Sequence, residues 1–398
     1  MAVFRRGDFL IPQEQYMEKW PVIACDQFTA EPEYWEQTAR LVGQAPSTYH
    51  MIFPEAELGT DEEARISRID RTMARYLSDG ILRSFPASYI YVERMLQDGS
   101  IRKGIVGLLD LEAYDFADRA ETPVRATEKT VVSRIPARVK IREGACLESS
   151  HVLLLCSDPT DDLIGGVERG ERLYDLDLML GGGHLTGWLV DGERADRYDA
   201  ALKAYISGKK DGFCFAVGDG NHSLAAAKSC WEKIKKQQSA DRLALHPARY
   251  AMVELENLFD PSQRFEPIHR IVRGVNPGEL IETLKKACVP GGETVKWIAG
   301  GSSGTLTFGP GVLPIGALQR EIDAFLADKG GEIDYIHGAE VAISLAGDDR
   351  SVAFILPEIE KNDLFRTIAR SGVLPRKTFS IGHAREKRYY LECRKIIP

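Results

Sequence analysis

Residues 213–223 read Phe213-Cys214-Phe215-Ala216-Val217-Gly218-Asp219-Gly220-Asn221-His222-Ser223 and are followed by Leu224-Ala225-Ala226-Ala227-Lys228. The apolar, aromatic start has strand character, the two glycines permit a tight turn, and the alanine-rich part favours a helix. A helix that begins just after a turn presents free backbone N–H groups and the positive end of its dipole. The sequence therefore predicts a strand, a turn and a helix start that together bind an anion or a phosphate group.

Two interpretations of the polar residues in this turn stay open. In the first, His222 binds phosphate or acts as a general acid or base, and Asp219 holds Mg²⁺. The phosphate-binding residues are then Gly218, Gly220, Asn221 and Ser223. In the second, Asp219 or Asn221 caps the helix and His222 bonds to the local backbone. A Walker-type loop is excluded, because the chain contains no GxxxxGK[ST].

The composition is that of a globular protein with an acidic balance. The 398 residues carry a formal net charge of −8, which argues against a general nucleic-acid-binding surface. No apolar run reaches the roughly 18 residues of a membrane span, and the N-terminus lacks the apolar core of a signal peptide. The seven cysteines are scattered and form no CxxC pair, which favours reduced thiols. We therefore expect a cytoplasmic protein with no membrane partner.

The hydrophobic pattern predicts a mixture of hairpins and helices, so the expected fold class is α+β rather than a doubly wound sheet. A β-hairpin is expected over residues 88–115 with its turn at Asp98-Gly99, and a helix over 61–79. The glycines at 181–183 and 300–301 are expected in hairpin loops. Further strands are expected at 21–25, 151–157, 249–258, 294–298, 304–308, 352–356 and 388–396, and further helices at 196–207, 222–238, 277–288, 317–328 and 359–371.

The pattern of elements restarts beyond Pro267, which predicts two domains, residues 1–260 and 261–398. Residues 366–398 carry nine Lys or Arg against two Glu, so the second domain ends in a basic tail. A basic segment in an acidic protein is expected to contact an anionic small ligand or a second subunit of a homodimer. The alternative is a solvated basic face.

Five segments of the chain carry a resemblance. They are Tyr91–Tyr114, Ala126-Thr127-Glu128-Lys129-Thr130 with Ala137-Arg138, Asp219-Gly220-Asn221-His222-Ser223, Pro267-Ile268-His269-Arg270 and Leu374-Pro375-Arg376-Lys377-Thr378-Phe379. In this order they resemble the conserved elements of the bacterial family catalogued as domain of unknown function 1015, over nearly the whole chain. The chain departs from the family at Thr127, Asn221 and Ser223, where the family has His, His and Arg. The lost Arg removes a bidentate phosphate contact, which Arg376, Lys377 or Arg385 would have to replace.

The family's Asp-Gly-His-His-Arg signature is in turn similar to the nucleotide site of ParB-type and sulfiredoxin-type proteins and of free-serine kinases built on that fold. This resemblance implies a ParB/sulfiredoxin-like mixed α/β N-terminal region that holds phosphates, followed by a smaller α/β domain. It is an analogy at the signature region, and function has to be argued from the site itself.

Several residues outside the turn are candidates for chemistry. Glu128 lies in a polar, turn-like stretch and is either the base that takes a proton from a substrate hydroxyl or a surface glutamate. Asp26 follows an apolar strand and is either a further site carboxylate or a helix N-cap. The remaining candidates for phosphate or nucleotide contacts are Thr130, Arg138, Arg270 and Lys377, of which the two arginines could equally form structural salt bridges.

Three hypotheses about function follow. The first is a phosphotransferase or phosphatase-like enzyme acting on a small hydroxylated or phosphorylated metabolite, with serine or phosphoserine first, and with Mg²⁺ and a nucleotide (ATP, ADP or CTP) as cofactors. The second is a ParB-like nucleotide or metabolite sensor without turnover, which the missing signature Arg and Asn221 favour. The third is a structural or interaction protein. Glu128→Gln separates the first two, because in an enzyme it abolishes turnover and leaves ligand affinity largely intact.

Overall fold

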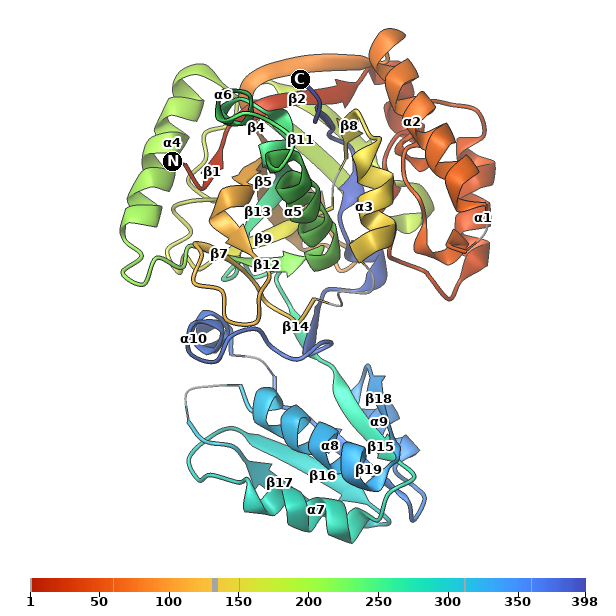
Figure 1. Ribbon diagram of the computed structural model, residues 1–398, viewed down its shortest axis with the longest axis vertical. Coiled ribbons are helices and arrows are strands. Elements are labelled where there is room, and N and C mark those ends of the chain that lie inside the picture. The colour runs from red at the N-terminus through yellow and green to blue at the C-terminus, as the bar shows by residue number, and fades with distance from the viewer. Residues whose placement is uncertain (1, 60, 131–134, 150, 311–312, 359) are drawn as a thin grey trace. The chain divides into compact units, whose positions relative to one another are not determined.

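The computed structural model describes residues 2–59, 61–130, 135–149, 151–310, 313–358 and 360–398 (Figure 1). The chain divides into two units. Unit 1 comprises Met1–Ala126, Thr130–Gln263 and His383–Pro398, and unit 2 comprises Thr127–Lys129 and Arg264–Gly382. This differs from the expected division after residue 260 in two ways. Residues 127–129 belong to unit 2, and the end of the basic tail returns to unit 1.

Within the described residues, unit 1 is built on an eleven-stranded mixed sheet. The order is β10-β11-β4-β5-β13-β9-β12-β7-β6, while β1 pairs with β5 and β2 with β4. The strands are β1 (Phe4–Arg5), β2 (Gly7–Pro12), β4 (Leu82–Met95), β5 (Ile101–Asp110), β6 (Tyr114–Asp115), β7 (Val124–Ala126), β9 (Leu153–Cys156), β10 (Arg172–Asp177), β11 (His184–Val190), β12 (Phe215–Asp219) and β13 (Tyr250–Asn257). The sheet contains parallel pairs, β12 with β7 and β13 with β9, and antiparallel pairs, β12 with β9 and β13 with β5. Together with the helices that flank it, this mixed sheet confirms the α+β class.

The predicted hairpins are present. Strands β4 and β5 pair antiparallel, and their turn contains Gly99 at φ +81°, a left-handed conformation that glycine adopts without strain. The glycines at 181–183 lie between the antiparallel strands β10 and β11. Gly300 and Gly301 form the two-residue loop of a hairpin in unit 2, both with positive φ, as a type I′ turn requires.

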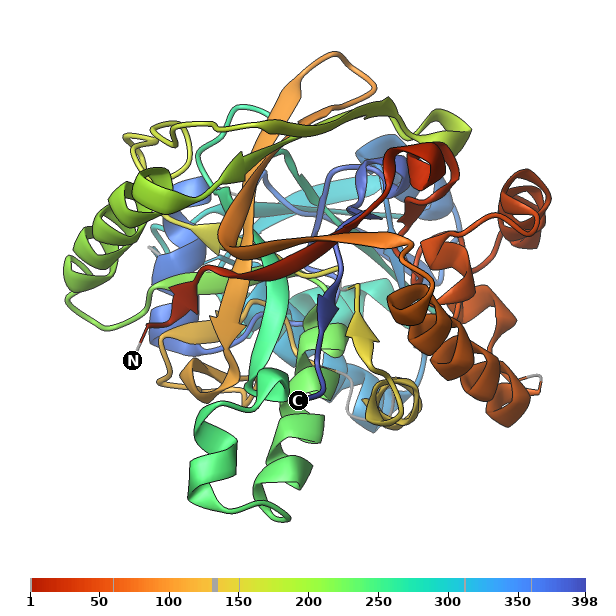
Figure 2. The ribbon, with the colours of Figure 1, turned by 90° about the horizontal axis from the view of Figure 1, so that it is seen from above.

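Helices flank the sheet of unit 1. Figures 1 and 2 show α2 and α4 at opposite sides of it, with α5 beside α3. The buried residues of α5 include three consecutive alanines, whose small side chains allow α3 to pack closely along it. The helices are α1 (Pro32–Val42), α2 (Glu62–Ser78), α3 (Ile135–Glu143), α4 (Gly192–Ser207), α5 (Asn221–Lys235) and α6 (Ala240–Ala244). The short 3₁₀ helices are η1 (Glu14–Lys19), η2 (Thr48–His50), η3 (Glu55–Glu57), η4 (Leu111–Ala113), η6 (Met179–Gly181), η7 (Pro247–Arg249) and η8 (Ala384–Glu386).

The C-terminal segment of unit 1 forms two strands of two residues each in place of the one expected at 388–396. Strand β21 (Tyr389–Tyr390) pairs with β3 (Val22–Ile23), and β22 (Arg394–Lys395) pairs with β8 (Leu147–Glu148). The end of the chain is therefore joined to two segments that are more than 200 positions away in the sequence.

Unit 2 has a five-stranded antiparallel sheet in the order β17-β16-β19-β15-β18 among its described residues. The strands are β15 (His269–Arg273), β16 (Thr294–Ala299), β17 (Ser302–Thr307), β18 (Glu332–Ile336) and β19 (Ser351–Ile355), and a separate pair is β14 (Phe265–Pro267) with β20 (Phe379–Ile381). The helices are α7 (Pro277–Lys286), α8 (Ile315–Lys329), α9 (Ala339–Leu345) and α10 (Lys361–Ser371). Helices α7 and α8 lie side by side along this sheet (Figure 1). No helix in the described ranges of either unit combines the length and the apolar character needed to cross a bilayer.

Candidate functional site

The predicted strand, turn and helix are confirmed at residues 215–235. Strand β12 ends at Asp219, Gly220 has a φ of +78°, and α5 begins at Asn221. A Cβ on Gly220 would collide with the carbonyl oxygen of His151, so no other residue fits without a shift of the backbone. Gly218 does not belong to the turn, because it lies inside β12 at a shift of the register with β9.

Neither Asp219 nor Asn221 caps α5, so this part of the helix-capping interpretation is wrong. The N-cap of α5 is Gly220, which has no side chain that could accept a hydrogen bond from the first amides of the helix. Asp219 instead accepts a 2.8 Å hydrogen bond from the backbone N–H of Gly220. The side-chain oxygen of Asn221 is buried and has no hydrogen-bond partner among the described residues. Neither of the two side chains expected to cap α5 therefore does so, and the anion site expected at the start of this helix stays a prediction.

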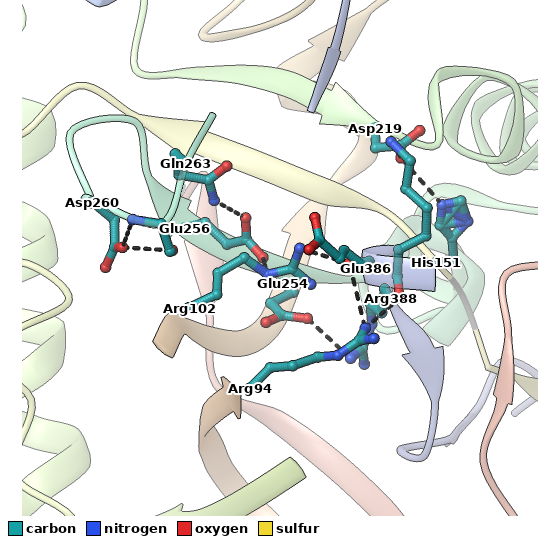
Figure 3. A network of polar contacts seen from close by, with 12 residues as sticks. Arg94, Arg102, His151, Asp219, Glu254, Glu256, Asp260, Gln263, Glu386 and Arg388 are labelled. Carbon is teal, nitrogen blue, oxygen red and sulfur yellow. Dashed lines mark hydrogen bonds and ion pairs between the residues drawn. The ribbon is translucent and has the colours of Figure 1, made fainter. Parts of the chain in front are cut away.

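Sheet pairing brings a histidine to this turn. In the pairing of β12 with β9, Asp219 lies opposite Leu153, so His151 stands two residues before the partner of Asp219. The Nε2 atom of His151 lies 3.7 Å from the Oδ2 atom of Asp219 (Figure 3). The His151 side chain is 1% exposed, and this Nε2 atom has no hydrogen-bond partner in the described structure. A buried ring nitrogen without a partner is costly, which is typical of a functional site.

A second carboxylate and an ammonium group complete the cluster. The pairing of β3 with β21 brings Asp26 and Lys387 from opposite ends of the chain to one place. The Nδ1 atom of His151 lies 3.8 Å from Asp26 Oδ1, and Lys387 Nζ lies 2.9 Å from Asp219 Oδ2. The four side chains Asp26, His151, Asp219 and Lys387 are called the Asp–His–Lys cluster below.

The electrostatics of the cluster keep Asp219 ionised. Burial opposes the charge on this carboxylate, but Lys387 and His151 outweigh burial and lower the pKa of Asp219 from 3.8 to about 2. At neutral pH the carboxylate is therefore available as a ligand or as an acceptor of hydrogen bonds.

The cluster has the composition of a cation site. One ligand atom each from Asp26, His151 and Asp219 lies within 4.8 Å of the others. Imidazole suits Zn²⁺ and Fe²⁺, while carboxylate suits Mg²⁺ and Mn²⁺. Because the two ring nitrogens of His151 face different carboxylates, one nitrogen can bind a cation while the other donates to a carboxylate, as metal-bound histidines commonly do. The sequence predicted Asp219 as a metal ligand, which stays a prediction, and His151 and Asp26 are the groups whose potential ligand atoms lie near it.

Hydrogen bonds to backbone carbonyl oxygens and a buried ion pair fix the segment that carries Lys387 (Figure 3). Arg94 donates to the carbonyl oxygen of Arg385 at 2.6 Å, and Arg102 donates to that of Glu386 at 2.9 Å. Arg388 pairs with Glu254 at 3.0 Å, with both side chains at most 4% exposed. Removing one partner of a buried pair typically costs about 3–5 kcal/mol. The network therefore holds the backbone on both sides of Lys387 against the sheet.

A cavity of about 140 Å³ lies next to the cluster in unit 1. Its polar wall includes His151, Ser223 and Arg138, and its other walls are mainly apolar side chains from α2, α3 and the segment after η2. Arg138 forms an ion pair with Glu55 in this wall. The predicted residues Asp219, Asn221, Ser223 and Arg138 thus belong to one region of unit 1, together with His151.

Other predicted site residues lie in unit 2. The carboxylate of Glu128 accepts hydrogen bonds from the backbone N–H groups of Lys377 at 3.1 Å and Thr378 at 2.9 Å. Burial raises the pKa of Glu128 to about 7, although these N–H groups and Arg270 act in the opposite direction. Three of the five segments that carry the family resemblance therefore meet around Glu128. The prediction that Glu128 and His222 share one site stays a prediction, since they belong to different units.

Arg270 is completely buried in unit 2. Its guanidinium donates to the side chain of Gln319 at 2.9 Å and to the carbonyl oxygens of Ile268 and Arg376, and it stacks on the ring of Tyr335 at 4.7 Å. These bonds give Arg270 a structural role through neutral acceptors rather than through a salt bridge, and its contact with phosphate stays a prediction. Lys377 is exposed, with a φ of +54° and its ammonium 5.3 Å from the same ring.

The remaining predicted residues lie at separate places in unit 1. Thr130 is buried in unit 1, and its hydroxyl has no hydrogen-bond partner among the described residues. His222 is the second residue of α5. Arg385 donates to the carbonyl oxygen of Leu180 at 2.6 Å, in the loop between β10 and β11. Sequence reasoning missed His151 and Lys387, because neither lies in a motif and only strand pairing brings them to Asp219.

Comparison with known proteins assigns the chain to a family. A family model described as "Protein of unknown function (DUF1015)" matches residues 10–393. The chain belongs to this family. The match confirms the resemblance that the five sequence segments indicated. Among curated proteins, no sequence matches the chain.

Solved structures show a weaker likeness. A free serine kinase in complex with AMP is 13% identical with a TM-score of 0.38, and the match covers 73% of this chain and 90% of that chain. SbnI with a C-terminal truncation, from Staphylococcus aureus, is 10% identical with a TM-score of 0.37 over 72% of this chain and 85% of its own. A conserved hypothetical protein from Pyrococcus furiosus is 12% identical with a TM-score of 0.34 over 73% and 94%. Likenesses at these TM-scores carry no argument about function.

Proposed function

We propose that the protein is a phosphotransferase, dependent on a divalent cation, that acts between a nucleotide and a small hydroxylated metabolite, or a phosphatase-like enzyme that runs the reverse step. The observation that carries the proposal is the Asp–His–Lys cluster at the start of α5, where the N-cap is a glycine. A cation site next to the positive end of a helix dipole is a combination suited to phosphoryl transfer, because charge on the phosphoryl oxygens has to be neutralised from several sides.

Each group of the cluster has a role in this proposal. Asp219 and His151 hold the cation, with Asp26 either as a third ligand or as the acceptor that orients the imidazole ring. The backbone N–H groups at the start of α5 bind phosphate oxygens. Lys387 neutralises Asp219 in the absence of a cation. When a cation takes over this carboxylate, the Lys387 ammonium becomes available to a phosphate.

The cavity beside His151 and Ser223 is the proposed place for the part of the metabolite that carries the hydroxyl group. Its small volume of about 140 Å³ favours a compound of few atoms, and its mainly apolar walls favour a short aliphatic part. Serine and phosphoserine are the first compounds to test, followed by aliphatic hydroxy acids of similar size.

A second candidate function is a nucleotide or metabolite sensor without turnover. It is favoured by Ser223 in place of the family's Arg and by the pairing of Arg138 with Glu55, which leave few cationic side chains in the cavity wall for a transferred phosphoryl group. In this case the cluster binds a nucleotide phosphate and nothing is transferred.

The test combines binding and turnover. Thermal shifts of the purified chain are measured with ATP, ADP, CTP, pyrophosphate, serine and phosphoserine, each with EDTA, Mg²⁺ or Mn²⁺. Turnover is then followed by phosphorus NMR. The variants are Asp219→Asn and, as a matched control, Asp241→Asn, an exposed aspartate on α6.

We expect a cation-dependent shift with a nucleotide or a phosphorylated metabolite that Asp219→Asn loses and Asp241→Asn keeps. Turnover with the same dependence supports the enzyme, and binding without turnover supports the sensor. A chain that shows no cation-dependent shift with any of these ligands contradicts both candidates.

A further inference from the structure

A groove lined by arginines runs along the outer side of α2 in unit 1. Four arginines recur every three or four residues on this helix, so they share one side of it. They line a groove of about 440 Å³ together with Tyr49 and His50 of η2. The arginines are Arg65, Arg68, Arg71 and Arg75. Buried Met73 and Tyr76 pack into the core, and Ile69, which is also buried, lies at the floor of the groove.

The arginines repel one another and have few acidic partners. Like charges three or four positions apart on a helix destabilise it, and this stretch contains three such pairs in sequence. Arg65 pairs with Glu57 at 3.0 Å, whereas Arg68, Arg71 and Arg75 form no ion pair with a carboxylate in the described part of the chain. This arrangement is unexpected in a chain of net charge −8, where carboxylates are in excess. An external anion would remove the repulsion.

The carboxylates near the groove do not fill it. Asp70 is directed toward α3, since its carboxylate is the group that a side chain at Gly144 would meet. Glu62 and Glu63 lie in the first turn of α2, before the arginines, and Asp79 follows the last turn. Glu57 of η3 is already engaged by Arg65.

Aromatic rings and hydrogen bonds hold part of the groove in place. The guanidinium of Arg65 lies 5.7 Å from the ring centres of both Tyr49 and Phe53, and Arg71 donates to the hydroxyl of Ser67 at 2.6 Å. His50 is half-buried among these groups. Burial lowers the pKa of His50, and the charges of Arg65 and Arg75 lower it further. The imidazole therefore lies in the positive field of the groove and can report on any anion that enters it.

We propose that this groove binds an oligophosphate, either the phosphate chain of a nucleotide or free inorganic triphosphate. Guanidinium groups bind phosphate oxygens in bidentate geometry, and an oligophosphate carries several negative charges that can contact several of these arginines at once. From Arg65 to Arg75 the helix rises about 15 Å, a span that one phosphate group cannot cover. The groove shares no lining residue with the cavity beside the Asp–His–Lys cluster, so this is a second site, independent of the proposed function.

The test is isothermal titration calorimetry of the full chain with inorganic triphosphate, ATP and AMP, in EDTA so that no cation supports the cluster. The groove variant is Arg68→Gln with Arg71→Gln. The matched control is Arg242→Gln with Arg370→Gln, two exposed helix arginines elsewhere. Asp219→Asn tests whether the signal comes from the cluster instead. Melting temperatures check that each variant is folded.

We expect triphosphate to bind the wild type, the control and Asp219→Asn with equal affinity. It should bind the groove variant about tenfold or more weakly. AMP should bind the wild type less tightly than triphosphate does. ATP that binds more tightly than triphosphate identifies a nucleotide as the ligand, and equal affinities identify the phosphate chain alone. In NMR titrations, saturation with triphosphate should raise the pKa of His50. Equal affinity of the groove variant and the control, or an unchanged His50 titration at saturation, overturns the proposal.

Discussion

Replacing Lys387 by methionine tests whether its ammonium neutralises the Asp219 carboxylate. The two groups are 2.9 Å apart, with side chains 12% and 20% exposed. Burial opposes the charge, yet Lys387 and His151 hold the pKa of Asp219 at about 2 instead of 3.8. At about 1.4 kcal/mol per pKa step, this difference corresponds to about 2 kcal/mol of unfolding free energy at pH 7. We expect Lys387→Met to lose an amount of this order, since methionine keeps most of the aliphatic side chain and removes the charge while the carboxylate stays buried.

The pH dependence follows from the direction of the pKa change. The pKa of Asp219 is lower in the folded chain than in the unfolded chain, so its stabilising contribution is present above pH 3.8. The contribution disappears as the pH falls through about 2. The wild type should therefore lose stability over this interval more steeply than the Lys387→Met variant.

The measurement is urea unfolding followed by tryptophan fluorescence. Four of the five tryptophans lie in unit 1, so the signal reports mainly on the unit that holds the cluster. Lys203→Met, at an exposed position of α4, is the matched control and should change the unfolding free energy by less than about 0.5 kcal/mol.

The same unfolding measurement with a divalent cation tests whether the cluster binds one. In EDTA the Met variant should show its full loss, and in Mn²⁺ the loss should shrink because the cation replaces the ammonium beside Asp219. Equal stability of Lys387→Met and Lys203→Met in EDTA would refute the electrostatic reasoning. A loss of the same size with and without Mn²⁺ would refute the cluster as a cation site.

Three further changes test other parts of the argument. Gly220→Ala should lower the unfolding free energy by about 1–3 kcal/mol in thermal melts, because alanine is strained at positive φ and its Cβ collides with His151. Gly316→Ala, in the first turn of α8 with open space around it, is the control and should be neutral or stabilising. Ala226→Leu should narrow the cavity and cost about 1–3 kcal/mol of unfolding free energy, because Ala226 is buried against α3, while calorimetry shows loss of small-molecule binding. Binding that survives would separate the cavity from the site. The pKa of Glu128 is raised from 4.5 to about 7, so unit 2 should lose stability as the pH rises between these values, and Glu128→Gln should remove this dependence in hydrogen-exchange measurements.

The sequence predicted correctly those elements whose own residues mark them, such as apolar runs bounded by turn glycines. The segment from Phe215 to Lys235 combines an apolar run, glycines and alanines within about twenty positions, and its strand, turn and helix follow from those residues. The hairpin around Gly99 is of the same kind, because a turn residue that needs positive φ stands between two alternating apolar runs.

Elements with weak local signals were missed. Helix α3 (Ile135–Glu143) has two fully buried residues among several charged ones, and its position is decided by packing against α5. Strand β18 (Glu332–Ile336) is an edge strand of the sheet in unit 2, and none of its residues is buried. Its sequence therefore lacks the continuous apolar run that is typical of a buried strand. Strand β15 and helix α9 are short and were also missed, because pairing with neighbours rather than their own composition stabilises them.

The sequence by itself determined the family, the glycine turn and the start of α5 at Asn221. Only the tertiary structure decided that His151 and Lys387 stand beside Asp219 and that Asp26 belongs with them. The physical reason is that strand pairing makes these contacts. The pairing of β12 with β9 and of β21 with β3 joins residues up to several hundred positions apart, and hydrogen bonds between distant strands leave no periodic pattern in either segment. A turn is encoded by its own residues, whereas a site assembled from four segments depends on the whole sheet.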